Sequence, residues 1–346
     1  MPPEHKPARI QWYRCKLTRE QLSDLNRKSD FLAFLQTGGY LGLLAATATL
    51  SVYAAYHWPW YLTLALLFFH GTCFGFTINA FHELIHDSVF KTRWLNRFFL
   101  RVFSFIGWHN HHFFWASHTE HHKYTLHPPS DLEFERPTII TLRDFLSVAF
   151  INVRDTWPIL RNTARHARGR VDGRWAEYLF PESQPDERRK LRNWARCLIL
   201  GHGTIILVSL VMGWWMIPVV TSLAPFYGNG LHFLCNSAQH IGLRDNVADF
   251  RLCCRTIYLN PLVQFLYWHM NYHTEHHMYA GVPCYRLGKL HRLIKHEMPE
   301  CPNGLVQTWR QIIAILQKQK TDRDYCYVPT LPENSLPTTA ETAVPG

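Results

Sequence analysis

The sequence lacks charge over two long stretches. No Asp, Glu, Lys or Arg occurs in residues 31–82, a run of 52 residues, or in residues 197–243, a run of 47. Charged residues make up 18% of the chain, against about 25% in an average soluble domain. Because a helix needs about 20 apolar residues to cross the hydrocarbon of a membrane, each run is long enough for two crossings. Two such runs favour a membrane protein over a soluble protein with buried hairpins.

Several common sequence signatures are also missing. The nine cysteines are scattered and form no repeated CxxC pair, which excludes a zinc ribbon and a rubredoxin-like site. The first residues, MPPEHKPARIQWYRCK, have no apolar core of the kind that a cleavable signal peptide carries. We therefore expect the first apolar helix to serve as the membrane signal. The chain contains no nucleic-acid-binding motif, so nucleic acid is not an expected partner.

The charge-free runs predict four transmembrane helices in two hairpins. The first hairpin is expected at 31–55 and 60–81, with a turn at His57-Trp58-Pro59-Trp60, and the second at 197–216 and 219–240, with a turn at Pro218. Neither turn contains Lys or Arg. Since positively charged segments remain in the cytosol, we expect both termini and segment 83–196 to be cytosolic. The net charge of +10 would then face anionic headgroups or an acidic redox partner.

The predicted fold is an all-α integral membrane protein whose four transmembrane helices carry a cytosolic helical cap. The expected organisation is a cytosolic N-terminal segment (1–30), a membrane domain with its cap (31–295), an amphipathic helical region (296–328) and a disordered tail (329–346). Within these parts, segments 141–160 and 305–318 are predicted amphipathic helices, because apolar residues recur there on one helix face. We expect both to lie on the cap or on the membrane surface.

Histidine is the residue type that this chain has in abundance, with 22 in total. Many of them fall into three short boxes. The first is His82-Glu-Leu-Ile-His86, at the cytosolic end of the second predicted span. Residues four apart share one face of a helix, so both rings can approach one ion. The other two boxes have the same sequence, HTEHH. The first of them contains His118, His121 and His122, and the second contains His273, His276 and His277.

This histidine content predicts a site for two metal ions. Neutral imidazole suits Zn, Cu, Fe and Ni, and eight or more ligands exceed the four that one structural zinc takes. Spacing alone does not decide between the metals. The histidines at 109, 111, 112 and 269 lie close enough in sequence to substitute for a ligand, whereas those at 5, 57, 70, 166, 202, 291 and 296 are interpreted as ordinary polar surface.

The boxes HELIH, HTEHH and HTEHH resemble those of the membrane fatty-acid desaturase and hydroxylase superfamily, over roughly residues 40–295. The phrases HELIHDSVFKTRWLN and NYHTEHHMYAGVPCYRLGKLH are similar to its bacterial-type and carotenoid-modifying branches. Acyl-CoA desaturases of the superfamily also carry an NxxxH motif, which matches Asn236-Ser-Ala-Gln-His240 here. They commonly have four residues between the histidines of the first box, whereas this chain has three.

The resemblance implies two iron ions and a set of ligands. One iron would be bound by His82, His86, His118, His122 and His276, and the other by His121, His240, His273 and His277. Asn236 would hold a metal-bound water. Histidine ligands usually hydrogen-bond a carboxylate through their second nitrogen. The carboxylates near the boxes that could accept such a bond are Glu83, Asp87, Glu120, Asp131 and Glu275. The alternative interpretation is that they are ordinary solvated charges.

The resemblance further implies O2-dependent oxidation of an unactivated C–H bond in a lipid. Fatty acyl desaturation is the first expectation, and hydroxylation or ketone formation on a fatty chain, a carotenoid or another isoprenoid is the alternative. Trp108, Phe113, Phe114 and Trp115 are candidates to line an apolar tunnel or to anchor the membrane interface. No HPGG segment of a fused cytochrome b5 is present, so a separate donor is expected, such as cytochrome b5, ferredoxin or rubredoxin with its reductase.

Two other classes of function compete with this reading. A zinc-dependent membrane hydrolase would need fewer ligands and an open coordination position. A metal transporter should place its histidines near the middle of the membrane, whereas here they are predicted at the cytosolic ends of the spans and in the cap. The active site is accordingly expected on the cytosolic side, at a bacterial inner membrane or the endoplasmic reticulum.

Overall fold

Helices form nearly all the regular structure of the chain. The computed structural model describes residues 8–133 and 140–333, and its only β contacts within these ranges are four isolated bridges. The first half contains α1 (Arg19–Leu25), α2 (Asp30–His57), α3 (Trp60–Phe74), α4 (Thr77–Ile85), α5 (Arg93–Ile106), α6 (His111–Tyr124), α7 (Leu142–Ala149), α8 (Val153–Ala167) and α9 (Arg174–Leu179). The second half contains α10 (Pro185–Val211), α11 (Met216–Val220), η1 (Ala224–Phe226), α12 (Gly230–Ser237), α13 (Phe250–Cys253), α14 (Pro261–Leu266), α15 (His273–Met278), α16 (Cys284–Ile294), η2 (Lys295–Glu297) and α17 (Gly304–Lys318).

Three helices of the described chain are long and apolar enough to cross a membrane: α2, the continuous rod 60–85 formed by α3 and α4, and α10. Their most apolar windows are only 33%, 39% and 22% buried against the rest of the protein. Such large apolar surfaces cannot remain in water at low cost, so they need a lipid environment. The predicted spans 31–55 and 60–81 match α2 and α3–α4, and the predicted span 197–216 lies mostly within α10.

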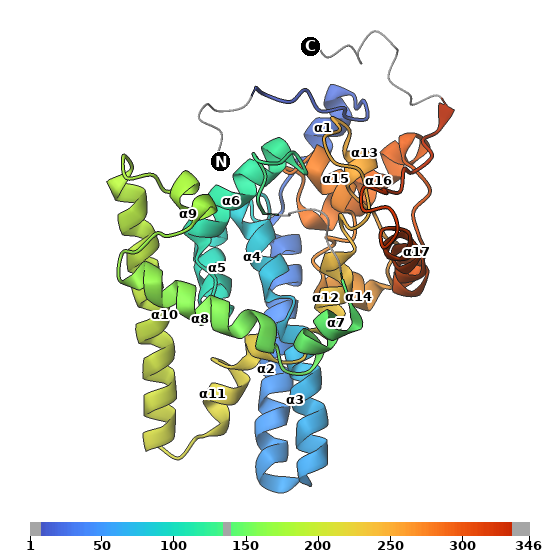
Figure 1. Cartoon of the computed structure of the whole chain (residues 1–346). Helices are drawn as coiled ribbons and strands as arrows, with labels where there is room; N and C mark the ends of the chain where they lie inside the picture. The colour runs from blue at the N-terminus through green and yellow to red at the C-terminus, as the bar shows by residue number, and fades with distance from the viewer. Residues whose placement is uncertain (1–7, 134–139, 334–346) are drawn as a thin grey trace.

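The turn between α2 and α3 lies where the sequence predicts it. Asp30 begins α2 after Ser29, whose side chain accepts a hydrogen bond from the backbone N–H of Leu32. The helix ends at His57, because Trp58 precedes a proline and adopts an extended conformation. Pro59 then starts the next helix at Trp60, so the two apolar helices return antiparallel to each other (Figure 1).

The prediction of a continuous fourth span at 219–240 was wrong. This stretch forms the end of α11, the single turn η1 and α12, separated by irregular segments. Pro218 and Pro225 lack the N–H that a helix interior requires, and Gly228 adopts a left-handed conformation with φ of +72°. The actual turn after α10 is at residues 212–215, before Pro218, with Gly213 at φ of +73°.

The broken segment packs closely against α3 because two glycines meet there. A side-chain carbon on Gly71 would lie 2.3 Å from Cδ2 of Tyr227. One on Gly228 would lie 2.6 Å from the backbone nitrogen of Thr72. Neither position has room for a larger residue, so these glycines set the distance between α3 and the irregular chain beside it.

Three histidines interpreted as polar surface are buried instead, which corrects that interpretation. His70 is fully buried and joins Thr47 Oγ1 to the carbonyl oxygen of Val220, at 2.8 and 3.0 Å. His202 is 1% exposed and lies between the rings of Phe105 and Trp108. The third, His291, is 4% exposed. Polar groups in an apolar interior need hydrogen-bond partners. The sequence does not show which backbone carbonyl groups a broken helix leaves unpaired, so it does not reveal that a buried histidine can bond to them.

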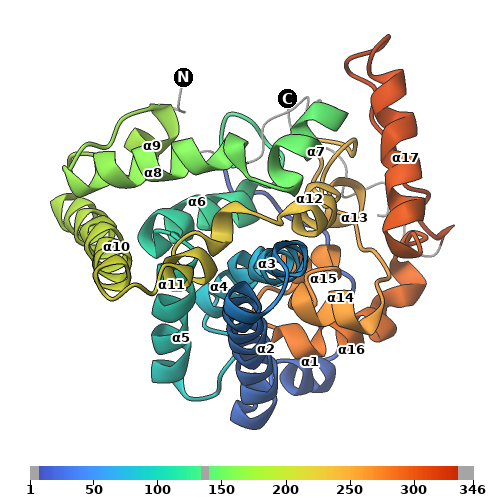
Figure 2. The same ribbon diagram turned by 90° about the horizontal axis from the view of Figure 1, so that it is seen from below.

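The helices are arranged in two tiers. The α2–α3 hairpin and the α10–α11 hairpin project together from one side of the molecule, whereas α7 and α8 run crosswise above them (Figure 1). Figure 2 shows α2, α3 and α11 near the centre of the view from below, with α8, α10 and α17 around the edge. The predicted amphipathic segments are helical, as α7, α8 and α17. Residues 334–346 of the predicted disordered tail lie outside the described residues.

Candidate metal centre

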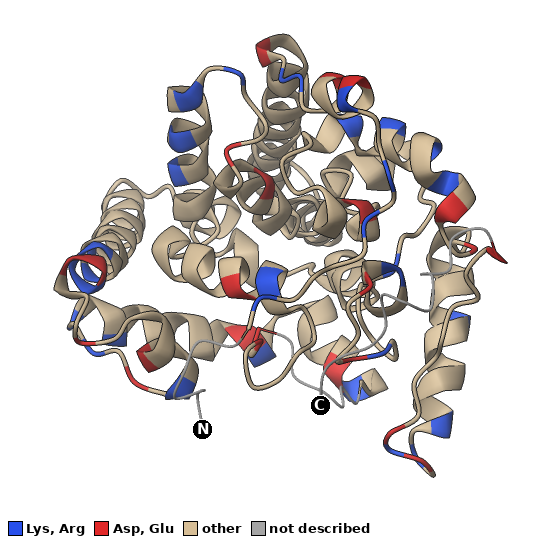
Figure 3. Cartoon of the chain, turned by 90° about the horizontal axis from the view of Figure 1, so that it is seen from above, with Lys and Arg blue, Asp and Glu red and all other residues tan. Residues whose placement is uncertain are grey.

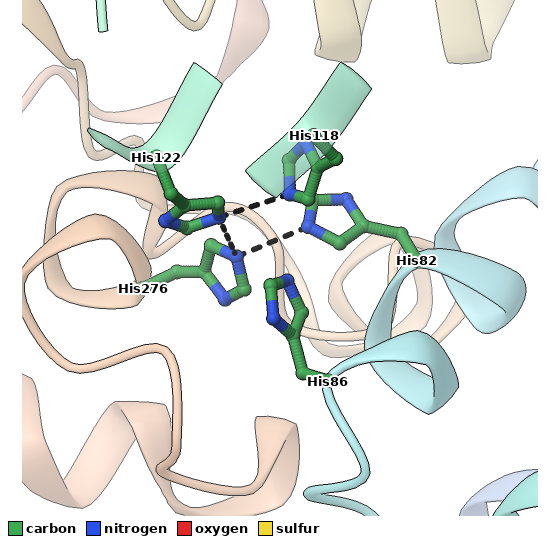
Figure 4. Close-up of side chains that lie close together, drawn as sticks. All are labelled: His82, His86, His118, His122 and His276. Carbon is green, nitrogen blue, oxygen red and sulfur yellow. Dashed lines mark hydrogen bonds between the residues drawn. The ribbon is translucent and has the colours of Figure 1, made fainter. Parts of the chain in front are cut away.

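Nine histidines converge above the apolar hairpins in two groups. The first, the five-histidine group, consists of His82, His86, His118, His122 and His276, and the second, the four-histidine group, of His121, His240, His273 and His277. Within each group the potential donor atoms all lie within 4.8 Å of one another. The structure thus brings together every histidine that the sequence analysis proposed, in the same two sets, and Figure 4 shows the first set.

Four short elements supply these side chains. His82 lies in the last turn of α4, and His86 caps the same helix. The two HTEHH boxes form part of α6 and all but the last residue of α15. His240 follows α12 by less than one turn. In α6 the rings of His118 and His122 face the first group, whereas His121 turns to the second, because neighbouring positions on a helix differ by about 100°.

The imidazole nitrogens approach one another closely within each group. In the five-histidine group, Nε2 of His122 lies 2.9 Å from Nε2 of His118 and 3.2 Å from Nε2 of His276. In the four-histidine group, Nε2 of His273 lies 2.9 Å from Nε2 of His240 and 3.1 Å from Nε2 of His277. The two groups adjoin, because the rings of His122 and His277 stack with centroids 4.4 Å apart.

The outer ring nitrogens face acceptors. Nδ1 of His118 lies 3.0 Å from Glu133 Oε1, and Nδ1 of His121 lies 2.8 Å from Asp131 Oδ2. Nδ1 of His240 lies 2.8 Å from the carbonyl oxygen of Cys253. A carboxylate and a carbonyl only accept hydrogen bonds, so the neutral rings of His118 and His240 carry their proton on Nδ1 and a lone pair on Nε2.

Imidazole lone pairs that converge in this way are stabilised by a cation between them. An unprotonated Nε2 cannot donate a hydrogen bond to another unprotonated Nε2, and buried polar atoms without partners are costly. A metal ion in each group would satisfy all of them at once. The donor set therefore fits a pair of transition-metal ions bound by imidazole.

The ionisation of the cap histidines is suited to metal binding. Burial, together with the neighbouring imidazoles, holds the pKa of His118, His122, His273, His276 and His277 well below its ordinary value. These rings are neutral at pH 7, as a ligand must be. His121 differs: burial lowers its pKa, but the charge and the hydrogen bond of Asp131 outweigh burial and raise it to about 9. A carboxylate partner of this kind also increases the basicity of a ligating nitrogen.

The predicted carboxylate partners divide into those that contact a histidine of the groups and those that do not. Asp131 contacts His121, and Glu83 Oε1 lies 3.4 Å from His276 Nδ1 in a buried position. The prediction was wrong for Glu120, which pairs with Lys123 on the cap surface at 2.8 Å. It was also wrong for Glu275, whose two oxygens contact Thr256 and His291. Both side chains point away because they lie on the far side of their helices from the neighbouring ligands.

Two further predicted residues do not reach the histidine groups. Asp87 follows α4 with φ of 55°, and its carbonyl oxygen accepts a hydrogen bond from Lys28. No hydrogen bond within 8–133 and 140–333 joins its carboxylate to either group. Asn236 is exposed and lines a cavity below the histidines. Of the alternative ligands, His109 stacks on Phe81 and His269 contacts Gln264, so neither belongs to a group.

Sequence reasoning missed three outer partners. Glu133 accepts from both His118 and Ser117, and it lies in the same HPPSDLEFE segment as Asp131. Its position two residues after Asp131 was the available signal. Thr125 Oγ1 lies 3.2 Å from His277 Nδ1, and Met270 Sδ lies 3.3 Å from His273 Nδ1. Nothing in the local sequence marks these two residues as partners.

The centre can be reached from the cap. A cleft of about 460 Å³ is lined by His86, His122 and His277, with Trp115 and Arg14 at its sides. It therefore touches histidines of both groups. Trp115, predicted as a tunnel or interface residue, lies here, whereas Trp108, Phe113 and Phe114 line a separate cavity of about 490 Å³ beside α8.

Comparison with known proteins assigns the chain to a family. The family model for fatty acid desaturase matches residues 56–309, which include all nine histidines. A curated relative from Oryza sativa subsp. japonica, described as sphingolipid delta(4)-desaturase DES1-like, is 25% identical over 300 residues, covering 84% of this chain and 80% of the relative. The protein therefore belongs to the fatty acid desaturase family.

Proposed function

We propose that this protein is a membrane-bound, di-iron lipid desaturase that oxidises an unactivated C–H bond with O2. The convergence of nine imidazoles in two adjoining groups carries the proposal. Membership of the fatty acid desaturase family supports an oxidoreductase that acts on lipid. Two irons bound in these groups would supply, with O2, the oxidant that such a bond requires, since no amino-acid side chain can break it as an acid or base.

The protein residues have three tasks in this reaction. The nine histidines would hold both ions, and Asp131 and Glu133 orient the rings of His121 and His118. Burial of the groups limits the access of water, which protects the reacting carbon from side reactions. The cleft over His86 and His122 leaves one side open to the cap surface, where a separate electron donor can approach.

Each turnover needs two electrons, and we propose that a separate protein delivers them. Cytochrome b5, ferredoxin and rubredoxin, each with its reductase, are the candidate donors. Lys and Arg occur on many of the elements that surround the cap in the view from above (Figure 3). Arg14 and Lys123 line the cleft itself. Positive charge around the cleft favours an acidic donor by electrostatic steering.

The proposed orientation puts both termini and the metal centre in the cytosol. The projecting ends of the apolar hairpins carry no Lys or Arg, whereas the cap is basic, and positively charged segments are retained on the cytosolic side. The membrane is then a bacterial inner membrane or the endoplasmic reticulum. We keep residues 31–295 as the catalytic membrane domain, preceded by the cytosolic segment 1–30 and followed by the helical region 296–328.

Hydroxylation or ketone formation on a fatty chain, a carotenoid or another isoprenoid is the alternative outcome at the same site. The histidine groups would serve either reaction, and the position of the substrate decides between them. Mass spectrometry of the product distinguishes the two, because desaturation removes two hydrogens whereas hydroxylation adds one oxygen.

The decisive experiment is to purify the protein in detergent and to measure its metal content and its O2 uptake with a chemical reductant. About two irons per chain and reductant-dependent O2 uptake are expected. One zinc per chain without O2 uptake would contradict the proposal and favour a zinc-dependent membrane hydrolase. A metal transporter is disfavoured, since eight of the nine histidines lie beyond the three long apolar helices and His82 lies in the last turn of one.

A further inference from the structure

The helix α15 is the shortest of the three helices that carry the histidine boxes, yet it serves both histidine groups. It has six residues, of which His276 belongs to the five-histidine group and His273 and His277 to the four-histidine group. Helices shorter than about 12–15 residues are marginal by themselves, and within the described part of the chain no side chain caps the start of α15. Contacts with other elements must therefore fix the direction of its three histidines.

Glu275 is the side chain of α15 that points away from the histidine groups. Successive residues of a helix are rotated by about 100°, so Glu275 lies about 200° from His273 and about 160° from His277 around the helix axis. The side chain is fully buried. Its Oε2 accepts a hydrogen bond from Thr256 Oγ1 at 2.6 Å, and its Oε1 lies 2.5 Å from Nδ1 of His291. A rotation of α15 about its axis would break both contacts.

His291 extends this contact into the next helix, α16. The side chain is 4% exposed, and its Nε2 lies 2.9 Å from the hydroxyl oxygen of Tyr258. A carboxylate only accepts hydrogen bonds, so Nδ1 of His291 carries the hydrogen that binds Glu275. The imidazole therefore joins the carboxylate of α15 to a phenol on a third element. Figure 1 shows α15 and α16 next to each other.

The backbone at Tyr258 is itself held in place. Its N–H donates to the carbonyl oxygen of Pro302 at 3.0 Å, and its carbonyl oxygen accepts from the N–H of Gly304 at 2.8 Å. Neither of these bonds involves α15. The chain of contacts from Glu275 through His291 therefore ends on backbone that is fixed independently of the helix that it supports.

The first HTEHH box contains a glutamate at the same position, but this residue has a different environment. Glu120 pairs with Lys123 on the cap surface at 2.8 Å. The helix around it, α6, has 14 residues, and the side chain of Asn110 caps its start. A longer, capped helix makes enough contacts of its own to fix its rotation, whereas α15 does not. The buried anchor is thus a property of α15 and not of the HTEHH sequence.

We propose that His291 is a positioning residue for both metal sites, which acts through Glu275 to keep the histidines of α15 facing the two groups. Thr256 and Tyr258 complete this anchor. The inference rests on the proposed function, which requires a metal ion in each group. Because α15 supplies both groups, loss of the anchor weakens both sites together. The side chain of Asp131, by contrast, contacts one histidine of a single group.

Titration of Co2+ into the metal-free, full-length protein in detergent tests this inference without reference to catalysis. The visible absorption of Co2+ depends on the number and geometry of its ligands. The unmodified protein should bind one Co2+ in each group. His291→Phe keeps a ring and removes both nitrogens. It should weaken both sites by about tenfold, the lower end of the range for loss of an outer partner, and should change the absorption at saturation.

Three further variants identify the cause of such a loss. His291→Asn keeps an N–H donor near the position of Nδ1, so it should restore most of the affinity and the native absorption. Thr256→Val keeps the shape of the side chain and removes one hydrogen bond to Glu275, so it should weaken both sites by about fivefold. Glu120→Gln is the matched control from the other HTEHH box and should bind Co2+ as the unmodified protein does.

Native affinity at both sites in His291→Phe, or a loss at one site only, would overturn the inference. Equal losses in His291→Asn and His291→Phe would also overturn it, because lost packing would then be the cause. If His291→Phe does not fold, Thr256→Val decides the question, and native binding by that variant refutes the anchor.

O2 uptake by the iron-loaded protein separates this inference from the proposed function. Two linked metal sites in a protein without O2 uptake refute the desaturase function and leave the anchor in place. O2 uptake by the unmodified protein, together with native Co2+ binding by His291→Phe, refutes the anchor alone.

Discussion

Asp131→Asn should weaken metal binding at the four-histidine group while leaving the fold intact. In the native protein Oδ2 of Asp131 accepts from His121 Nδ1 at 2.8 Å and from the backbone N–H of Leu126 at 2.9 Å. Oδ1 accepts from the backbone N–H of Glu133 at 3.0 Å. Both carboxylate oxygens accept hydrogen bonds, but asparagine replaces one of them with an NH2 group. In either orientation of the amide, this NH2 group faces at least one N–H donor and cannot bond to it.

The expected magnitude follows from these contacts. The favourable orientation of the asparagine sets its NH2 against the N–H of Glu133 and keeps the bond to His121, but the negative charge beside His121 is lost. Loss of such an outer partner typically lowers metal affinity by about 10- to 100-fold, equivalent to about 1.4–2.7 kcal/mol. The unmatched backbone N–H should cost a further ~1–3 kcal/mol of folding free energy, since Asp131 is 1% exposed.

The assay is iron retention as a function of chelator concentration. Asp131→Asn should lose one of two irons at about 10- to 100-fold lower chelator than the unmodified protein, and the second iron later. Glu120→Gln is the control, because Glu120 pairs with Lys123 on the cap surface and contacts neither group. Retention of both irons by Asp131→Asn at the native chelator concentration would refute the role assigned to this carboxylate.

Three further predictions concern metal, pH and packing. His276→Ala should abolish iron binding and O2 uptake without preventing membrane insertion, as measured by metal analysis and membrane fractionation, and surviving activity would show that the ligand set is wrong. The metal-free protein should lose thermal stability as pH falls below about 6.5, because His122 and His277 protonate in the unfolded chain but stay neutral when folded. His121 acts in the opposite direction: because folding raises its pKa to about 9, its contribution to stability is lost as pH rises from about 6.5 to 9. A melting temperature that is unchanged from pH 7 to pH 5.5 would contradict this. Gly71→Ala should destabilise the protein by about 1–3 kcal/mol in thermal unfolding, because the added carbon would lie 2.3 Å from Tyr227, and a native melting temperature would show that α3 moves freely.

The sequence predicts the two histidine groups well because their main determinants are local. Spacing along a helix decides that His118 and His122 face one way and His121 another, and this spacing is visible in the letters HTEHH. Charge-free runs likewise predict the α2–α3 hairpin, because crossing a membrane requires length and apolarity, both of which can be counted.

The features that sequence reasoning missed depend on distant parts of the chain. Counting apolar residues predicted a helix at 219–240, although Pro225 and Gly228 break it. Glu275 and Glu83 look equivalent in sequence, yet only Glu83 faces a histidine of the groups, because the rotation of a helix is set by its packing partners. Glu133 was passed over for the same reason, since the loop that brings it to His118 has no periodicity from which its direction can be read.

The broken segment after α10 has a consequence for how the protein is assembled in the membrane. Its carbonyl groups at Val219, Val220 and Ser222 accept hydrogen bonds from Tyr227, His70 and Trp108. An isolated segment with unpaired backbone groups is not stable in hydrocarbon, and two of these three donors belong to elements made much earlier. The segment therefore depends on α3 and on the loop before α6 for its hydrogen bonds, and we expect it to reach its final position only after those earlier elements have folded.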